Sequence, residues 1–232
     1  MRLTVPDIAR MMDFSAVQAE SSEEDVRDLA RRAKHYQCVA VFTLPSQTPL
    51  VAELLAGEPA IAIGGVVGFP SGGTTAESKA REAEELLRMG CGELDMVINV
   101  GMLRSRRNDR VEDDIRRVVD AAKGAPVKVI LECHHLSHDE IRTGCELSVK
   151  AGAAWVKTGT GWAPTGATLE NVALIKSCVG DAVGIKAAGG VRGLETLVEM
   201  YRRGARRFGV GAGSAVKILQ QCATRPGGFV EF

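Results

Sequence analysis

Two kinds of segment alternate along the 232 residues, and this alternation restricts the fold more than any other feature of the chain. Short apolar runs rich in β-branched residues are each followed by a polar stretch with helical periodicity. The eight strand-like runs are MMDFSAV (11–17), CVAVFTL (38–44), AIAIGGVVGF (60–69), ELDMVINV (93–100), VKVILEC (127–133), AAWVKTG (153–159), AVGIKAAGG (182–190) and RRFGVGA (206–212). The pattern predicts an α/β fold with a parallel sheet closed as a (β/α)8 TIM barrel, and a doubly wound open sheet is the second choice.

Helical patterns fill most of the intervals between these runs. They cover residues 21–36, 74–90, 110–124, 137–152, 168–180 and 193–204, and several begin at a Ser or Thr or end at a Gly. The chain has no linker and no shift in composition, so we expect a single domain over residues 1–232. A short helix is expected near the N-terminus, and residues from about 217 to 232 are expected to be a helix end and tail.

The charge balance and the cysteines exclude several classes of function. The 29 basic and 29 acidic residues give a net charge of zero, and the basic clusters are mixed with acids. This favours solvated helix faces over a nucleic-acid or membrane-binding surface. The six cysteines form no CxxC pair, and no signal peptide or membrane-length apolar run is present. We therefore expect a cytoplasmic protein with reduced thiols.

Charged residues interrupt four neighbouring strand-like runs. Lys157 lies in the sixth run and Lys186 in the seventh, each followed closely by glycines, while Asp95 lies in the fourth and Lys128 in the fifth. In a barrel these positions meet where inward side chains are normally apolar. Burying an unpaired ammonium costs several kcal/mol, and two together also repel each other.

Imine formation is the chemistry that uses two adjacent buried lysines. A lysine beside a second cation in a dry pocket loses its proton more readily and attacks carbonyls near neutral pH. Asp95 and the second lysine would move protons during the bond-breaking step. A structural polar network explains the same spacing equally well, so the residues alone leave both readings open.

Two glycine-rich loops and a histidine cluster are weaker signals. The backbone N–H groups of Gly189, Gly190, Gly209 and Gly211 would cradle an anion after the last two strands. The run GVGAG is a poor dinucleotide motif because no strand with an acidic residue follows it. In ECHHLSH, the residues His134, His135 and His138 do not fit the HExxH zinc motif, and we expect no metal there.

Taken together, the motifs resemble those of the deoxyribose-phosphate aldolase family. The segments ELDMVINVG, VKVILE, AGAAWVKTGTGW, GATLENVALIK, VGIKAAGGVR and GARRFGVG stand in that family's order and spacing, and the resemblance extends from about Ile8 to about Val216. It implies a class I aldolase that cleaves 2-deoxy-D-ribose 5-phosphate to D-glyceraldehyde 3-phosphate and acetaldehyde through a lysine Schiff base. No metal or organic cofactor is implied.

The resemblance also assigns roles to residues. Lys157 matches the imine-forming lysine, Lys186 the second lysine that tunes it, and Asp95 the acid that works through an ordered water. Asp13 and Ser15 match positions that line the substrate pocket, and Ser15 stands where Thr is usual. Lys128 matches a supporting barrel lysine, and Thr158 follows the imine lysine as in the family. Both are expected among the substrate-binding residues. A homodimer is implied as a possible assembly.

Four further positions depart from the family pattern. Gly159 replaces a Ser, and Gly211 with Ala212 replaces hydroxyl residues of the last loop, where Ser214 would be a substitute. Ala188 stands where Ser or Pro is frequent. The missing hydroxyls favour, as an alternative, a related lysine aldolase with a different or non-phosphorylated substrate. A sugar-phosphate sensor without turnover and an NAD-dependent oxidoreductase are weaker alternatives.

Overall fold

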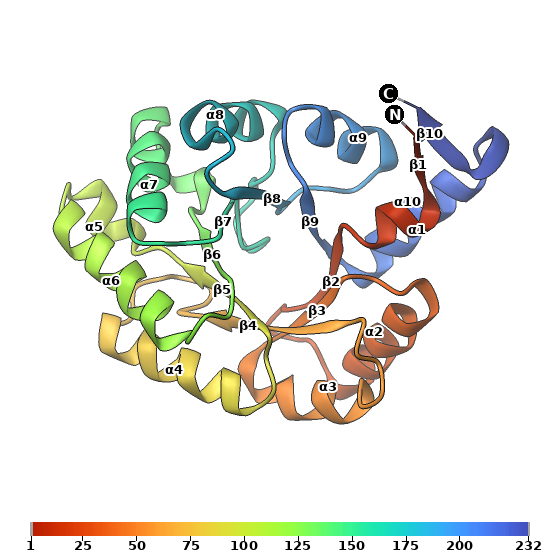
Figure 1. Cartoon of the computed structure of the whole chain (residues 1–232), viewed down its shortest axis with the longest axis horizontal. Helices are drawn as coiled ribbons and strands as arrows, with labels where there is room; N and C mark the ends of the chain where they lie inside the picture. Colours follow the sequence, from red (N-terminus) through yellow and green to blue (C-terminus); the bar gives the residue numbers. More distant parts are fainter. Residues whose placement is uncertain (1, 232) are drawn as a thin grey trace.

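A closed barrel of parallel strands forms the centre of the molecule (Figure 1). The computed structural model describes residues 2–231. The barrel strands, in chain order and in spatial order, are β2 (Met12–Ala16), β3 (Ala40–Thr43), β4 (Ala62–Val67), β5 (Glu93–Val97), β6 (Val127–Ile130), β7 (Trp155–Lys157), β8 (Gly184–Ala188) and β9 (Arg207–Gly211). Pairing of β9 with β2 closes the ring. The predicted (β/α)8 barrel is confirmed, and the open sheet is excluded.

Helices surround the barrel, as Figure 1 shows. They are α2 (Glu23–Tyr36), α3 (Thr48–Leu54), α4 (Ala76–Arg88), α5 (Val100–Arg104), α6 (Asn108–Ala121), α7 (His138–Lys150), α8 (Leu169–Val179), α9 (Leu194–Arg202) and α10 (Ala212–Ala223). Short 3-10 turns lie at Pro45–Gln47, Cys133–His135 and Pro226–Gly228. The Ser22 and Ser137 side chains accept hydrogen bonds from the third-residue N–H groups of α2 and α7, which satisfies otherwise unpaired donors at these helix starts.

The two termini pair with each other outside the barrel. Strand β1 (Arg2–Thr4) runs antiparallel to β10 (Phe229–Glu231), and the chain ends lie side by side in Figure 1. The predicted N-terminal helix is α1 (Val5–Ala9), which begins with a capping box at Thr4. The helix end expected from about residue 217 belongs to α10, which runs to Ala223, and the segment after it turns back and forms a strand with the N-terminus.

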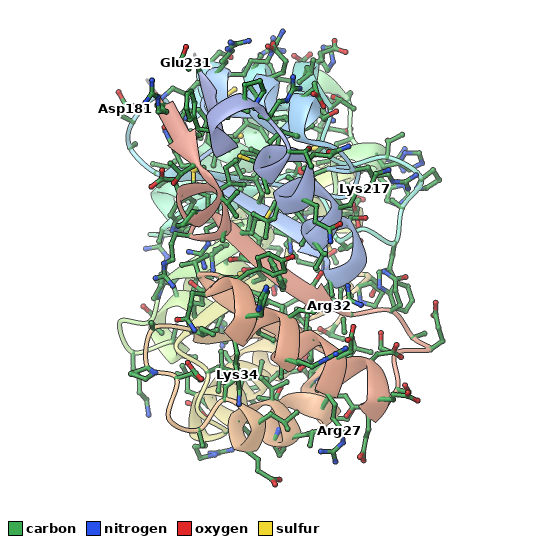
Figure 2. The ribbon with its side chains drawn as sticks, turned by 90° about the vertical axis from the view of Figure 1, so that its right-hand side faces the viewer. Arg27, Arg32, Lys34, Asp181, Lys217 and Glu231 are labelled. Atoms are coloured by element: carbon green, nitrogen blue, oxygen red, sulfur yellow. The ribbon has the colours of Figure 1, made fainter. Side chains whose placement is uncertain are left out.

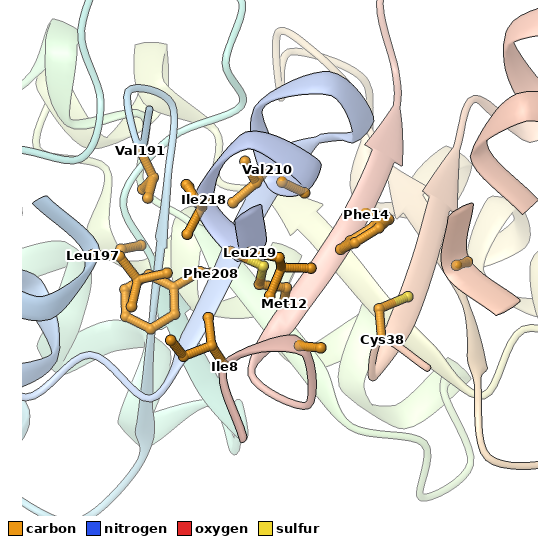
Figure 3. Close-up of a cluster of buried hydrophobic side chains, with 14 of the residues drawn as sticks. Ile8, Met12, Phe14, Cys38, Val191, Leu197, Phe208, Val210, Ile218 and Leu219 are labelled. Atoms are coloured by element: carbon orange, nitrogen blue, oxygen red, sulfur yellow. The ribbon is translucent and has the colours of Figure 1, made fainter. Parts of the chain in front are cut away.

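Apolar side chains fill the layer between strands and helices. Figure 3 shows part of this core, where Met12 and Phe208 of adjacent strands pack with Ile8 of α1 and Leu219 of α10. A second cluster packs β5, β6 and β7 against α4, α6 and α7. Along β2 the buried apolar Met12 and Phe14 alternate with Asp13, which faces the barrel interior. These two clusters lie between the strands and the helices, and the barrel interior holds charged groups together with a small apolar cluster that includes Phe42 and Val66.

The outer faces of the helices carry charges. Figure 2 shows Arg27 and Lys34 on α2 and Lys217 on α10, and all three are exposed. The exposure of these side chains agrees with the expectation that the charged residues lie on solvated helix faces. No helix within residues 2–231 is long and apolar enough to cross a bilayer. All six cysteines are free thiols, and all but Cys178 are buried.

Candidate active site

Two lysines and one aspartate meet inside the barrel. The β7–β8 register places Lys157 beside Lys186, and Asp95 projects from β5. The ammonium nitrogens of Lys157 and Lys186 lie 2.7 and 2.5 Å from the same Asp95 atom, Oδ2. Lys157 is 6% exposed, Lys186 1% and Asp95 0%. The sequence-predicted trio is thus brought together around a single carboxylate oxygen.

Asp13 and Lys128 extend this group to either side. Asp13 Oδ2 lies 2.5 Å from Lys186 Nζ, and Lys128 Nζ lies 3.2 Å from Asp95 Oδ1. The ring of Phe42 on β3 covers both lysines, with its centroid 4.1 Å from Lys186 Nζ and 5.2 Å from Lys128 Nζ. A cation on an aromatic face is stabilised by the ring quadrupole, so Phe42 shields these charges from water without neutralising them.

A cavity of about 560 Å³ opens over the trio at the C-terminal ends of the strands, the usual place for a barrel active site. The predicted site residues that line it are Asp13, Ser15, Lys157, Lys186, Gly189, Gly190, Gly209 and Gly211. At Gly209 a Cβ would lie 3.1 Å from Cε of Lys186, so this glycine leaves room for the lysine stem. Arg192 and Ser214 also line the cavity.

Three predicted residues lie behind the cavity wall instead. Asp95 is reached through the two lysines, and Lys128 is fully buried beneath it. Thr158 Oγ1 donates a hydrogen bond to the Ala188 carbonyl (2.7 Å) and accepts one from the Ala188 N–H (2.9 Å), which links β7 to β8. The structure therefore does not support the predicted substrate contacts of Lys128 and Thr158, whose side chains are occupied within the wall.

The environments of the two lysines separate their acidities. Burial lowers the pKa of Lys157 to about 8, and the Lys186 charge adds to this effect while Asp95 opposes it. Burial also acts against the charge on Lys186, but Asp13 and Asp95 outweigh it and raise the pKa of Lys186 above its ordinary value. The three lysines around Asp95 overcome the effect of burial and hold the pKa of Asp95 well below its usual range. Lys157 is thus the available nucleophile, and Lys186 stays a cation beside it.

This assignment predicts a pH dependence. The rate at which acetaldehyde is trapped on Lys157 by cyanoborohydride should rise with pH through about 8, because only the free amine attacks. The unfolded chain keeps Lys157 protonated up to about 10.5, so Lys157 makes the free energy of unfolding rise with pH between about 8 and 10.5. Urea unfolding of the wild type and of Lys157→Met across that window measures the difference. An identical pH slope in both proteins would contradict the assignment.

Gly159, one of the departures from the family pattern, is confined by its neighbours. A Cβ at this position would lie 2.9 Å from Glu132 Oε1 and 3.1 Å from Cα of Gly166. Glu132 in turn accepts hydrogen bonds from the N–H and hydroxyl of Thr160. The loop after β7 is therefore closed around a glycine, and the space of the missing hydroxyl is filled.

Restoring the serine should consequently be harmful. Gly159→Ser is expected to lower the free energy of unfolding by about 1–3 kcal/mol, the usual cost of overpacking a filled site. Gly211→Ser is the matched control, because a Cβ there meets nothing within 4 Å and the backbone φ of −59° suits any residue. Thermal unfolding of both variants gives the comparison. If Gly159→Ser is as stable as the wild type, Glu132 and Gly166 can move to make room for the added side chain, and the prediction is wrong.

The histidine cluster does not converge. His134 Nδ1 lies 2.8 Å from the Thr165 hydroxyl, whereas His138 Nε2 lies 3.2 Å from Glu170 Oε1. No group of three His, Cys, Asp or Glu side chains suited to a metal occurs in the described part of the chain. These side chains belong to the surface around the barrel mouth.

Two buried charges were not indicated by the sequence patterns. Glu93 begins β5 and Arg207 begins β9, and their side chains meet inside the barrel with Arg207 Nη2 2.6 Å from Glu93 Oε1. The period-two spacing from Asp95 back to Glu93 is the signal that would have found the acid. Arg207 sits in a run of basic residues, RRGARR, which conceals its inward direction.

Comparisons with known proteins agree with this site. Residues 8–221 match the DeoC/LacD family aldolase profile. The deoxyribose-phosphate aldolase of Klebsiella pneumoniae is 45% identical over 100% of this chain and 94% of its own length, and that of Sinorhizobium medicae is 48% identical over 95% and 89%. The tetrameric deoxyribose phosphate aldolase of Aeropyrum pernix superposes with a TM-score of 0.87 at 32% identity, covering 95% of this chain and 93% of its own. The paired buried lysines, the barrel and the sequence all agree with these matches. This chain therefore belongs to the DeoC/LacD family of aldolases.

Proposed function

We propose that this aldolase, a carbon–carbon lyase, reversibly cleaves 2-deoxy-D-ribose 5-phosphate to D-glyceraldehyde 3-phosphate and acetaldehyde. The observation that carries the proposal is the sharing of one Asp95 oxygen by Lys157 and Lys186 at the base of the cavity. This arrangement supplies a nucleophilic amine, a neighbouring cation and a proton acceptor within a few ångströms. The full-length relatives that carry the name deoxyribose-phosphate aldolase support the same substrate.

The proposed reaction proceeds through Lys157. Its free amine adds to C1 of the open-chain sugar, and loss of water leaves a protonated imine. A base formed by Asp95 through a water takes the C3 hydroxyl proton, the C2–C3 bond breaks, and the bond electrons move into an enamine while the aldehyde product leaves. Protonation of the enamine at C2, with Lys186 and Asp95 in the relay, gives the imine of acetaldehyde. Water then hydrolyses this imine and restores the Lys157 amine.

The other end of the cavity suits the phosphate group. Gly189 and Gly190 have positive φ values of 81° and 127°, and they line the cavity together with Arg192 and the first turn of α10. Backbone N–H groups at a helix start and an arginine are ordinary ligands of a phosphate. We assign Gly189, Gly190, Gly209 and Gly211 to this end, and Asp13 and Ser15 to the sugar hydroxyls.

The test is a cleavage assay in which the product glyceraldehyde 3-phosphate is isomerised to dihydroxyacetone phosphate, which a coupling dehydrogenase reduces with NADH. Purified protein should turn over 2-deoxyribose 5-phosphate, and added acetaldehyde should reverse the reaction. If the protein forms an imine with acetaldehyde but does not cleave 2-deoxyribose 5-phosphate, the proposed substrate is wrong and the proposed imine chemistry still holds.

A second candidate is a related lysine aldolase with a different or non-phosphorylated substrate. It is favoured by one observation: Gly211 and Gly213 leave open space in the last loop, where no hydroxyl replaces the missing side chains except Ser214. Each absent hydrogen bond to a charged group would weaken binding by about 1.5–3 kcal/mol. The ratio of kcat/KM for 2-deoxyribose 5-phosphate and for 2-deoxyribose decides, because the second candidate requires a ratio near or below one.

We further propose a cytoplasmic location and a homodimer. The free, mostly buried cysteines support a reducing compartment. The dimer rests on the family resemblance alone, and the Aeropyrum pernix relative is tetrameric. Light scattering on the protein as it elutes from a size-exclusion column measures the molecular mass of the assembly and so distinguishes a dimer from a tetramer. The proposed binding partners are small aldehydes and sugar phosphates. We propose no binding to nucleic acid or to membranes.

A further inference from the structure

The charges inside the barrel form a closed ring of six groups. Starting from Asp95, the contacts run to Lys186 (2.5 Å), Asp13 (2.5 Å), Arg207 (2.6 Å), Glu93 (2.6 Å), Lys128 (3.1 Å) and back to Asp95 (3.2 Å). Cations and anions alternate at every step. The six residues come from five of the eight barrel strands, and none is more than 9% exposed. We call this set the charge ring.

Each carboxylate in the charge ring uses its two oxygens for two different cations. Asp13 places Oδ2 on Lys186 and Oδ1 on Arg207, and Glu93 places Oε1 on Arg207 and Oε2 on the Lys128 ammonium. Arg207 bridges the two acids with Nε and Nη2. A planar guanidinium fixes the angle between its donors, which an ammonium cannot do. Arg207 therefore sets how Asp13 and Glu93 face the lysines.

Lys157 stands outside the charge ring. It contacts Asp95 Oδ2, which Lys186 already occupies. The charge ring contains three cations (Lys128, Lys186, Arg207) and three anions (Asp13, Glu93, Asp95), so its charges cancel. Protonation of Lys157 adds a fourth cation to a set that is already balanced.

We propose that Glu93 and Arg207 are positioning residues of the aldolase, which close the charge ring and make Lys157 the one cation in excess of it. Neither residue lines the cavity. They act through Asp13, Lys128 and Asp95, which they hold in place. This inference goes beyond the proposed substrate, because it concerns how the surrounding charges favour loss of the Lys157 proton, whatever carbonyl compound enters.

The other charged groups near Lys157 fit this account. Those that face it are Asp95 on β5, Lys128 on β6, Lys186 on β8 and Asp13 on β2, with Glu93 and Arg207 behind them. Glu132, on the loop after β6, is engaged by Thr160. All the ionic groups in contact with Asp95 other than Lys157 are thus members of the charge ring.

A purely structural role is the competing explanation. Buried ion pairs are often no more stabilising than apolar residues of the same size, because desolvation offsets the attraction. A gain in stability alone therefore does not explain why six buried charges are gathered in the charge ring. A structural role predicts that a broken ring lowers stability without moving the titration of Lys157 in a direction set by the charge removed.

The test uses charge-neutralising variants, of which Glu93→Gln keeps the size of the side chain and Arg207→Gln shortens it. Glu93→Gln removes an anion and should lower the pH midpoint of Lys157 titration by on the order of 0.5–1 pH unit, whereas Arg207→Gln removes a cation and should raise it by a similar amount. The double variant has two cations and two anions left in the ring, so its midpoint should return close to that of the wild type.

The midpoint is measured by competitive acetylation. Lys157 is labelled with isotopic acetic anhydride across the pH range, and the labelled peptide is quantified by mass spectrometry. This readout needs no turnover, so it remains valid if the proposed substrate is wrong. Asp114→Asn is the matched control, because Asp114 forms a buried ion pair with Lys79 between α4 and α6. This variant should be less stable than the wild type, but the midpoint of Lys157 titration should not move.

Opposite shifts in the two single variants, with return in the double variant, support the proposal. Unshifted midpoints, or shifts in the same direction, overturn it. If Arg207→Gln does not fold, Arg207→Lys is used instead, which keeps the charge but loses the fixed angle of the guanidinium. Its midpoint must then move less than that of Glu93→Gln, which must still fall; any other result for this pair also overturns the proposal.

Discussion

Replacing Lys157 with methionine should abolish imine formation and lower kcat/KM for cleavage by on the order of 10⁴-fold or more, the scale of losing a catalytic nucleophile. Burial lowers the pKa of Lys157 to about 8, and Lys157 lines the cavity, while Lys186 is held by Asp13 and Asp95. Methionine keeps the length of the side chain and removes one buried cation. The variant should therefore be at least as stable as the wild type near pH 7 while having no activity.

The matched control for this experiment is a buried lysine elsewhere. Lys79 is 0% exposed and donates hydrogen bonds to the Val97 carbonyl (2.8 Å) and to Asp114 (2.5 Å), outside the barrel interior. Lys79→Met strands the Asp114 charge and should reduce stability, yet it should still form the imine. Residual borohydride trapping in Lys157→Met at the wild-type level would mean that another lysine is the nucleophile.

Asp95→Asn should have the second largest effect, on both stability and activity. Asp95 is the shared partner of Lys157, Lys186 and Lys128, and an amide in its place leaves three buried ammonium groups around a neutral side chain. Removing one partner of a buried ion pair costs about 3–5 kcal/mol. Cleavage should fall by on the order of 10²–10⁴-fold, because the proton relay also loses its base.

A double variant separates the two contributions. In Asp95→Asn combined with Lys157→Met, one cation leaves together with the anion, so part of the lost stability should return. Urea unfolding of the two single variants and the double variant at pH 7 measures this coupling. Strict additivity of the two stability changes would contradict the ion pair drawn between these residues.

The barrel was predictable because its signals are local. Eight strand-like runs alternate with six helical patterns, and each can be recognised within a window of about 10–20 residues. The helices α3 and α5 carried no such signal, since they span only 7 and 5 residues. The strand β10 was missed for a different reason: its partner Arg2 lies 229 residues away from Glu231, and three-residue strands have no pattern of their own.

The centre of the site was predictable and its support was not. Lys157, Lys186 and Asp95 each break an apolar run, which marks them as inward charges in need of partners. Arg207 and Asp13 are 194 residues apart, and Arg207 and Glu93 are 114 apart, so no spacing rule connects them. The filled space beside Gly159 is equally a property of the folded loop, where Glu132 and Gly166 approach from other segments.

The most direct test of the central claim is a trapping experiment. The protein is incubated with 2-deoxyribose 5-phosphate, reduced with borohydride, digested and mapped by mass spectrometry. A two-carbon adduct on Lys157 is the predicted result, because it requires both imine formation at this lysine and cleavage of the C2–C3 bond. An adduct on another lysine, or no adduct with either the sugar phosphate or acetaldehyde, would contradict the account.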